Sequence, residues 1–232
     1  MRQLQLFEED LILTSHETPE DALELLKELK YRGAVIGTDE VGTGALAGPM
    51  AAAAVFLTGS QEKKLLSIGL KDSKKLKSEE RKKIFSVMNE IGVLWKITFG
   101  SIDKIEECNI LQTALWSMGQ SVLKIRKEIK NPIACVVVDG SRRIPELDEL
   151  PYDEKILQWP LVKADAIIPA VSAASVVAKV LRDKLMLTLD SVYPGYDFAE
   201  NKGYPTKEHR NAIRNLGLSD IHRQSFCKKI KL

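Results

Sequence analysis

The stretch from Val35 to Pro49 constrains the fold more than any other part of this sequence. Val35 and Ile36 favour a buried β-strand, and four glycines interrupt the residues after them, at positions 37, 42, 44 and 48. Two adjacent acids, Asp39 and Glu40, stand among these glycines. Because like charges a few ångströms apart resist joint ionisation, this pair is costly at a strand end unless a cation neutralises it. The stretch therefore indicates a site for Mg²⁺ or Mn²⁺, which prefer hard oxygen ligands, over the alternative of a solvated turn.

The length and charge of the chain narrow the class of protein. At 232 residues it is long enough for one large domain with its own core, and a net charge of +2 leaves any polyanion-binding site to a local patch. No run approaches the roughly 18 apolar residues of a membrane span, and the acids at positions 8–10 do not fit a signal peptide. Three cysteines, at positions 108, 135 and 227, form no C-x-x-C pair. We expect reduced thiols in a cytoplasmic protein that does not span a membrane.

The hydrophobic pattern alternates between strand-like and helix-like segments. Strands are predicted at residues 34–39, 50–57, 93–99, 134–140 and 159–163. Helices are predicted at residues 19–31, from 78 onward, after the cap Asn109, at 170–188 and at 206–216. Residues 141–157 are expected to form a polar connection. This mixture predicts an α/β fold with a mixed central sheet.

Acids end three of these predicted strands. Asp39 and Glu40 end the first, Asp139 follows three valines, and Asp165 follows the segment at 159–163. Strand termini of an α/β sheet lie along one edge, so four carboxylates can meet there and hold two Mg²⁺ ions roughly 3.5–4 Å apart. Taken singly, Asp139 also fits a turn and Asp165 a helix cap, but their joint placement favours a metal site for attack on a phosphodiester. Neighbours on a strand point to opposite faces, so Asp39 and Glu40 can share that site only if the strand has ended, as the glycines indicate.

Six motifs in this order resemble ribonuclease HII, the type 2 ribonuclease H family. They are Gly-Thr-Asp-Glu-Val-Gly at 37–42 with Ala-Gly-Pro at 47–49, Asp-Ser-Lys-Lys-Leu at 72–76, Val-Val-Asp-Gly at 137–140, Lys-Ala-Asp at 163–165, the helical run at 172–180 with Arg182 and Asp183, and Lys-Gly-Tyr-Pro-Thr at 202–206. The match predicts a catalytic domain over residues 34–226. An N-terminal arm and helix over 1–33 precede it, and a basic tail over 227–232 comes after it.

The resemblance implies a ribonuclease H-like fold whose mixed sheet is flanked by helices, with a C-terminal helical portion. It implies Mg²⁺- or Mn²⁺-dependent cleavage of the RNA strand of RNA–DNA hybrids, and of ribonucleotides embedded in DNA, leaving 5′-phosphate and 3′-hydroxyl ends. Asp39, Glu40, Asp139 and Asp165 would be the catalytic acids that bind two metal ions, and Tyr204 would stack on the sugar next to the cleaved ribonucleotide. A cytoplasmic monomer that acts in DNA replication and repair is the corresponding expectation.

Further substrate contacts are expected around these acids. The 2′-OH separates RNA from DNA, and the exposed backbone of Gly42, Thr43 and Gly44 can hydrogen-bond it. Lys74 and Lys75 are natural phosphate contacts. Four residues of the predicted helix at 170–188 either add phosphate contacts or cap and solvate that helix, namely Ser172, Ser175, Lys179 and Arg182. His209 and His222 have neither metal-ligand spacing nor a nucleophile beside them, so surface or capping roles are expected.

One departure from the family pattern bears on specificity. Ribonuclease HII enzymes usually have Gly-Arg-Gly where this chain has Gly42-Thr43-Gly44, a sequence that looks like ribonuclease HIII. Thr43 lacks the cationic fork that clamps a phosphate bidentately, so the hypothesis is a hybrid nuclease with altered recognition of single ribonucleotides in DNA. Two alternatives stay open. One is a ribonuclease HIII-like nuclease without that junction specificity, and the other is a catalytically silent module that binds hybrids.

Overall fold

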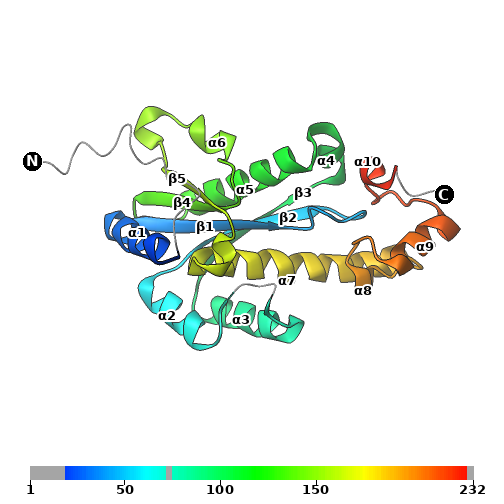
Figure 1. Ribbon diagram of the computed structural model, residues 1–232, viewed down its shortest axis with the longest axis horizontal. Coiled ribbons are helices and arrows are strands. Elements are labelled where there is room, and N and C mark those ends of the chain that lie inside the picture. The colour runs from blue at the N-terminus through cyan, green and yellow to red at the C-terminus, as the bar shows by residue number, and fades with distance from the viewer. Residues whose placement is uncertain (1–18, 72–74, 229–232) are drawn as a thin grey trace, which may run out of the picture.

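Five strands form one mixed sheet within the residues that the computed structural model describes, 19–71 and 75–228 (Figure 1). The strands are β1 (Ala34–Val41), β2 (Met50–Phe56), β3 (Leu94–Gly100), β4 (Ile133–Asp139) and β5 (Gln158–Leu161), in the order β3-β2-β1-β4-β5. β1 pairs antiparallel with β2 and parallel with β4, and β4 pairs parallel with β5. The expected mixed sheet is confirmed.

Helices flank this sheet on both faces (Figure 1). In the described residues they are α1 (Pro19–Arg32), α2 (Gly59–Ser67), α3 (Ser78–Glu90), α4 (Ile102–Cys108), α5 (Ile110–Arg126), α6 (Pro145–Asp148), α7 (Pro169–Val192), α8 (Phe198–Asn201), α9 (Lys207–Leu216) and α10 (Gln224–Cys227), with 3₁₀ turns η2 (Tyr152–Glu154) and η3 (Ala164–Ala166). α5 packs on one face, where Met118 and Val122 meet Ile36 of β1. α2, α3 and α7 cover the other face, where Val177 packs near Ala53 of β2.

Some elements differ from the sequence prediction. β1 continues to Val41 and does not end at residue 39, because β2 pairs with it as far as Ala51. The connection at 141–157 contains α6 and η2. The prediction missed α2, whose Thr58 forms a capping box with Gln61, and α4, which Ser101 caps. Both helices are too short to show a clear apolar period, so their caps were the available signal.

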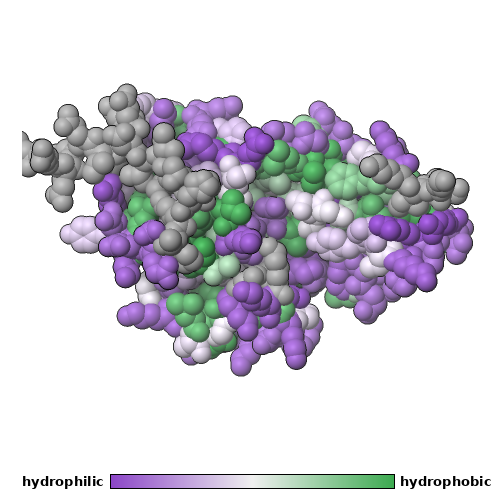
Figure 2. All heavy atoms as spheres, in the orientation of Figure 1, coloured by the Kyte–Doolittle hydropathy of each residue, from purple (hydrophilic) through white to green (hydrophobic). Residues whose placement is uncertain are grey.

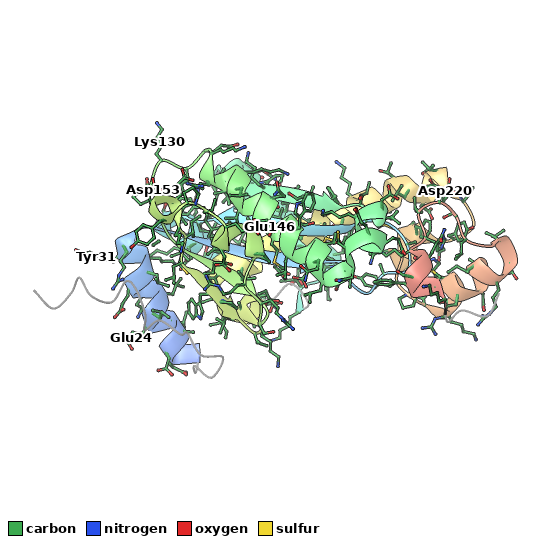
Figure 3. All side chains as sticks on the ribbon, turned by 90° about the horizontal axis from the view of Figure 1, so that it is seen from above. Glu24, Tyr31, Lys130, Glu146, Asp153 and Asp220 are labelled. Carbon is green, nitrogen blue, oxygen red and sulfur yellow. The ribbon has the colours of Figure 1, made fainter. Side chains whose placement is uncertain are left out.

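The far half of α7 carries a C-terminal lobe, residues 193–228, away from most of the sheet (Figures 1 and 3). Figure 3 places Asp220 in this lobe and Tyr31 of α1 at the opposite end of the molecule. Leu46, which lies after β1, is buried together with Phe198 and Ile213 of the lobe. The expected C-terminal helical portion is confirmed, and its core is shared with the turn after β1.

Polar and charged side chains cover much of the face shown in Figure 2, with separate hydrophobic areas between them. The exposed large apolar side chains are spread over several elements, from Tyr31 on α1 to Leu216 on α9. None of the helices in the described part of the chain is long and apolar enough to cross a bilayer.

Candidate active site

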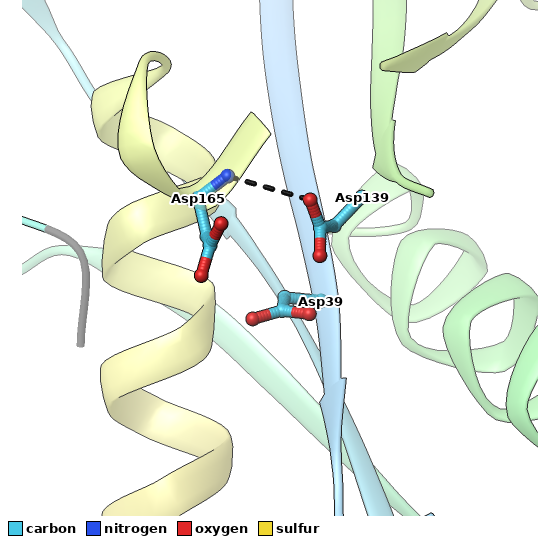
Figure 4. A group of neighbouring side chains, drawn as sticks. All are labelled: Asp39, Asp139 and Asp165. Atoms are coloured by element: carbon cyan, nitrogen blue, oxygen red, sulfur yellow. Dashed lines mark hydrogen bonds between the residues drawn. The ribbon is translucent and has the colours of Figure 1, made fainter. Parts of the chain in front are cut away.

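Three buried or half-buried carboxylates meet at one edge of the sheet (Figure 4). Asp39 lies near the end of β1, and Asp139 is the last residue of the parallel neighbour β4. The register places Thr38 beside Val138, so the acid after each of them reaches the same edge. Asp165 comes from η3, shortly before α7. One oxygen from each carboxylate lies within 4.8 Å of the others, so these three of the four predicted acids converge, although Asp165 lies in η3 and not at the end of β5.

The environment of this acid cluster disfavours three negative charges. Asp39 is only 4% exposed, and burial, then the charge of Glu40, then that of Asp139 raise its pKa well above the ordinary value. The backbone N–H of Asp165 donates to Asp139 Oδ1 across 3.5 Å. Converging hard oxygens that repel one another fit a divalent cation, because a cation removes the repulsion and a carboxylate set of this kind is its ordinary ligand shell.

Glu40 occupies a different position from the other three acids. Since β1 runs through Val41, the premise that the strand has ended before Glu40 is wrong, and the alternation of side chains separates Glu40 from Asp39. Glu40 is half-buried, and its backbone N–H donates to Asp39 Oδ1 at 2.7 Å. It nevertheless lines the same pocket as Asp39. Glu40 therefore stands at the edge of the acid cluster, within electrostatic reach of it.

Two buried serines of α7 contact Asp39 and Asp165. Ser175 hydrogen-bonds the carboxylate of Asp39, and the Ser172 hydroxyl donates to the backbone carbonyl of Asp165 at 2.6 Å. Both serines are buried. α7 can come this close because Gly37 faces it, where an added Cβ would lie 2.3 Å from the Val171 nitrogen. The Ser172 hydroxyl is turned toward carbonyls of its own chain, which favours the capping alternative for this residue over a phosphate contact.

Arg182 is also placed differently from the sequence expectation. It is 0% exposed, and its guanidinium donates to the backbone carbonyls of Pro49, Lys202 and Ala47. These contacts favour the structural alternative for Arg182 over a direct phosphate contact. Lys179, one turn earlier, is half-exposed, pairs with Asp183 at 2.8 Å and lines the pocket beside the acids.

The pocket beside the acid cluster joins elements that are distant in the sequence. Its lining comprises Asp39, Glu40, Val41, Arg81, Ser175, Lys179 and Tyr204. Tyr204 is half-buried, with the Lys179 ammonium 5.8 Å and the Arg182 guanidinium 5.4 Å from its ring centroid. Figure 4 shows the acids between β1 and the start of α7, the helix that also carries Lys179. Cationic and aromatic side chains thus border the carboxylates.

Arg81 is a pocket residue that the sequence motifs did not reveal. This residue of α3 donates from Nη1 to the carbonyl of Leu76 at 2.5 Å. The available signal was the position of Arg81 about one helical turn after Ser78, the first residue of α3. One turn into a helix, a side chain can point back toward the loop that precedes it. Lys75 is exposed at the end of this loop, and Lys74 lies outside the described residues.

The glycine-rich turn after β1 lies close to these residues. Gly42 has a φ of +85°, and a Cβ added there would fall 2.2 Å from Arg182 Nε, so both the backbone and the space require glycine. Thr43 is half-buried and Gly44 is exposed. Among the described atoms, none lies within 4 Å of where a Gly44 Cβ would be. The turn therefore presents accessible backbone at its tip.

The expected surface or capping roles of His209 and His222 are wrong. Both are buried, and their Nε2 atoms lie 3.1 Å apart. His209 Nδ1 contacts the Tyr204 carbonyl at 2.9 Å, and His222 Nδ1 accepts from the Ser219 backbone N–H. Burial, followed by the neighbouring His209, lowers the pKa of His222 to about 4. The pair depends on the packing of the C-terminal lobe, for which spacing in the sequence gives no signal.

A mixed sheet that brings carboxylates to one edge, next to a pocket with cationic and aromatic walls, is the arrangement of a metal-dependent nuclease with the ribonuclease H-like fold. The sequence model of the ribonuclease HII family matches residues 36–229. A ribonuclease HII from Acaryochloris marina is 41% identical over 83% of this chain and 92% of its own length. The chain therefore belongs to the ribonuclease HII family and is a metal-dependent endoribonuclease.

Solved structures agree on the fold. The crystal structure of ribonuclease H2 from Pyrococcus horikoshii superposes with a TM-score of 0.65 and 25% identity, over 85% of this chain and 96% of that one. A Bst ribonuclease HIII in complex with Mn²⁺ gives a TM-score of 0.61 and 22% identity, over 79% of this chain and 63% of that one. The second likeness supports the fold alone.

Proposed function

We propose that this enzyme hydrolyses the RNA strand of RNA–DNA hybrids and also cuts at ribonucleotides embedded in DNA. The observation that carries the proposal is the convergence of Asp39, Asp139 and Asp165 within 4.8 Å, beside a pocket that Lys179 and Tyr204 line. A phosphodiester next to a sugar has the chemistry that such a pocket would bind, since cations contact phosphates and an aromatic ring stacks on the nucleotide.

The metal site is the first element of this proposal. Asp39, Glu40, Asp139 and Asp165 would hold two Mg²⁺ or Mn²⁺ ions, with Glu40 reaching them from the edge of the acid cluster. When bound, such ions supply an activated water and neutralise charge on the leaving oxygen, which gives 5′-phosphate and 3′-hydroxyl ends. The protein's own part is to fix the carboxylates: Ser175 hydrogen-bonds Asp39, and the Asp165 backbone N–H contacts Asp139.

Substrate recognition is the second element. The ring of Tyr204 would stack on the sugar next to the cleaved bond, and the backbone of the turn at residues 42–44 would hydrogen-bond the 2′-OH. Lys179 and Arg81 line the pocket and would contact phosphates, together with Lys74 and Lys75 from the preceding loop. Only strands that contain a ribose complete this set of contacts, so an all-DNA duplex is expected to resist cleavage.

Thr43 sets the finer specificity in this proposal. An arginine at this position would offer a planar fork for a phosphate, whereas the threonine side chain is short and neutral. We therefore expect the enzyme to cut long hybrids and to recognise a single ribonucleotide in DNA less strongly. A ribonuclease HIII-like preference for hybrids alone is the second candidate, favoured by the same Gly-Thr-Gly sequence. The proposal further takes the enzyme as a cytoplasmic monomer that serves DNA replication and repair.

Three labelled duplexes test the proposed function: a long RNA–DNA hybrid, DNA with one embedded ribonucleotide, and all-DNA. Each is incubated in Mg²⁺, in Mn²⁺ and in chelator. Cleavage of the first two, only with metal, is the expected result. Cleavage of the hybrid alone would instead favour the ribonuclease HIII-like candidate, and binding without turnover in either metal would leave a silent binding module.

Two matched variants accompany this assay. Asp139→Asn removes one carboxylate of the acid cluster, whereas Asp220→Asn makes the same exchange at an exposed acid of the C-terminal lobe (Figure 3). Only the first should abolish cleavage. Equal activity of both variants would contradict the assignment of the site.

A further inference from the structure

Two arginines are completely buried in the C-terminal half of the chain and hold the turn after β1. Arg182 of α7 and Arg223, which precedes α10, are both 0% exposed. Burying a guanidinium costs free energy unless its N–H groups find acceptors. The acceptors therefore indicate which part of the chain each arginine holds in place. Burial and the charge of Arg182 lower the pKa of Arg223 to about 9, because each makes a second buried cation less favourable.

All acceptors but one are backbone carbonyls in the stretch 43–49. Arg223 donates from Nε and Nη2 to Gly48 at 3.0 and 2.8 Å, and from Nη1 to Thr43 at 3.2 Å. Arg182 donates from Nε to Pro49 at 2.9 Å. These bonds hold both ends of the glycine-rich turn, the entry at Thr43 and the exit at Pro49. The shape of the turn is therefore set by side chains that come from a distant part of the sequence.

Arg182 also reaches the loop that carries Tyr204. Its Nη1 donates to the Lys202 carbonyl at 2.9 Å, and its guanidinium carbon lies 5.4 Å from the Tyr204 ring centroid. The two loops contact one another directly as well, since the Leu46 backbone N–H donates to the Gly203 carbonyl at 2.8 Å. A Cβ at Gly203 would lie 2.3 Å from the Ala47 carbonyl oxygen, so this approach is close. The buried guanidinium of Arg182 thus fixes the position of the glycine-rich turn relative to the loop of Tyr204.

We infer that Arg182 and Arg223 are positioning residues for ribose recognition: they hold the backbone of the turn at 42–44 and the loop of Tyr204 in the shape that accepts a 2′-OH-bearing strand. This inference rests on the proposed role of that turn in substrate binding. Neither arginine touches the substrate, and neither belongs to the acid cluster. Their effect would appear in discrimination between ribose and deoxyribose, and metal binding would be unchanged.

Substitution by lysine separates positioning from charge. Arg223→Lys keeps the cation but cannot donate to Thr43 and Gly48 together, because a single ammonium lacks the planar fork. Arg214→Lys is the matched control, since Arg214 is exposed on α9 and donates to Asn211. Anisotropy gives the affinities for a labelled RNA–DNA hybrid and for an all-DNA duplex, with Ca²⁺ in place of Mg²⁺ and a gel to check that both stay intact. Thermal unfolding and its shift by Mn²⁺ report folding and metal binding.

The expected result is a loss of about tenfold in the hybrid-to-DNA affinity ratio for Arg223→Lys, as for one or two charge-assisted hydrogen bonds, with an unchanged Mn²⁺ shift. Arg214→Lys should retain the ratio. A folded Arg223→Lys protein whose ratio stays within about twofold of wild type would overturn the inference.

Two further outcomes keep the proposals separate. If wild type itself binds both duplexes equally, the proposed recognition of ribose by the turn is wrong, whatever the arginine variants do, whereas the cleavage assay decides separately on the proposed function. If Arg223→Lys does not fold, Arg182→Lys takes its place in the same assay. Failure of both variants to fold would overturn positioning in favour of a purely structural role.

Discussion

Ser175 of α7 hydrogen-bonds the carboxylate of Asp39 in β1, and so links the first half of the longest helix described to a buried member of the acid cluster. This bond lowers the pKa of Asp39, because it favours the charged carboxylate, whereas burial, Glu40 and Asp139 raise that pKa. The serine therefore favours the ionised form of Asp39, which is the form that the proposed metal site requires.

Replacing Ser175 by alanine should weaken metal binding more than folding. Loss of a group that orients a metal ligand typically costs about 10–100-fold in metal affinity or activity, so the Mg²⁺ concentration for half-maximal cleavage should rise about tenfold. Cleavage rates over a series of Mg²⁺ concentrations measure this. Ser86→Ala is the control, because Ser86 makes a hydroxyl–carboxylate bond with Glu90 on the exposed face of α3. Identical metal curves for the two variants would contradict the role of Ser175.

Replacing Asp39 by asparagine should inactivate the enzyme and stabilise its metal-free form at neutral pH. The pKa of Asp39 lies above its unfolded value, so the folded state binds more protons. The stability that this group contributes is therefore present at low pH and is lost as the pH rises through the folded pKa. Chemical unfolding in chelator measures this. The free energy of unfolding of the asparagine variant, relative to wild type, should be higher at pH 8 than at pH 5.

The same substitution has a separate kinetic expectation. Cleavage should fall by about a hundredfold or more, because metal assistance supplies several kcal/mol of transition-state stabilisation. Asp220→Asn should change neither property. A less stable Asp39→Asn protein in chelator would show that repulsion within the acid cluster does not govern its stability.

The buried histidine pair should give stability the opposite pH dependence. The pKa of His222 is lowered from 6.5 to about 4, so the unfolded state binds more protons between these values. Stability is fully present above the unfolded pKa and is lost as the pH falls toward 4, by roughly 3 kcal/mol for a shift of this size. Urea unfolding from pH 7 to pH 4 should show a shallower loss for His222→Asn than for wild type. Parallel curves would exclude His222 as the titrating group.

The Tyr204 ring should matter more than its hydroxyl. Tyr204→Phe keeps a face for stacking, whereas Tyr204→Ala removes it, and stacking of a base on an aromatic ring is worth about 1–3 kcal/mol. We expect kcat/KM on the hybrid to fall about tenfold to a hundredfold for alanine and by less than about threefold for phenylalanine. Equal losses for the two variants would move the role from the ring to the hydroxyl.

Thr43→Arg should shift preference toward the single ribonucleotide in DNA. A guanidinium at this tip can clamp a phosphate bidentately, which a threonine cannot. The measured quantity is the ratio of kcat/KM on the embedded-ribonucleotide duplex to that on the long hybrid, with Thr43→Ser as control. If both wild type and the arginine variant cut the two duplexes equally, Thr43 does not determine the substrate preference.

The sequence predicted the acid cluster and the sheet because their signals are local. An apolar run that leads into an acid marks the last part of a strand at Asp39 and Asp139, and parallel pairing of β1 with β4 then brings these two acids together. Asp165 follows β5 after a gap and lies in η3, so its strand-end position was predicted wrongly although its neighbourhood was correct. The positions of Arg182 and His222 were missed because side-chain periodicity does not report which carbonyls or rings a distant segment offers. For Glu40 the prediction was partly correct. Glu40 lies beside the acid cluster as expected, but β1 continues past it to Val41.

The hydrogen bond from Arg223 to the Thr43 carbonyl spans 180 residues of sequence. During synthesis, the segments that carry the acids leave the ribosome well before Arg223 does. A nascent chain with its acids already paired would still lack the second anchor of the glycine-rich turn. On the proposed role of this turn, the chain could bind a ribonucleotide strand in its final geometry only after almost all of this sequence has emerged. Refolding should show the same order, because contacts of such long range close last.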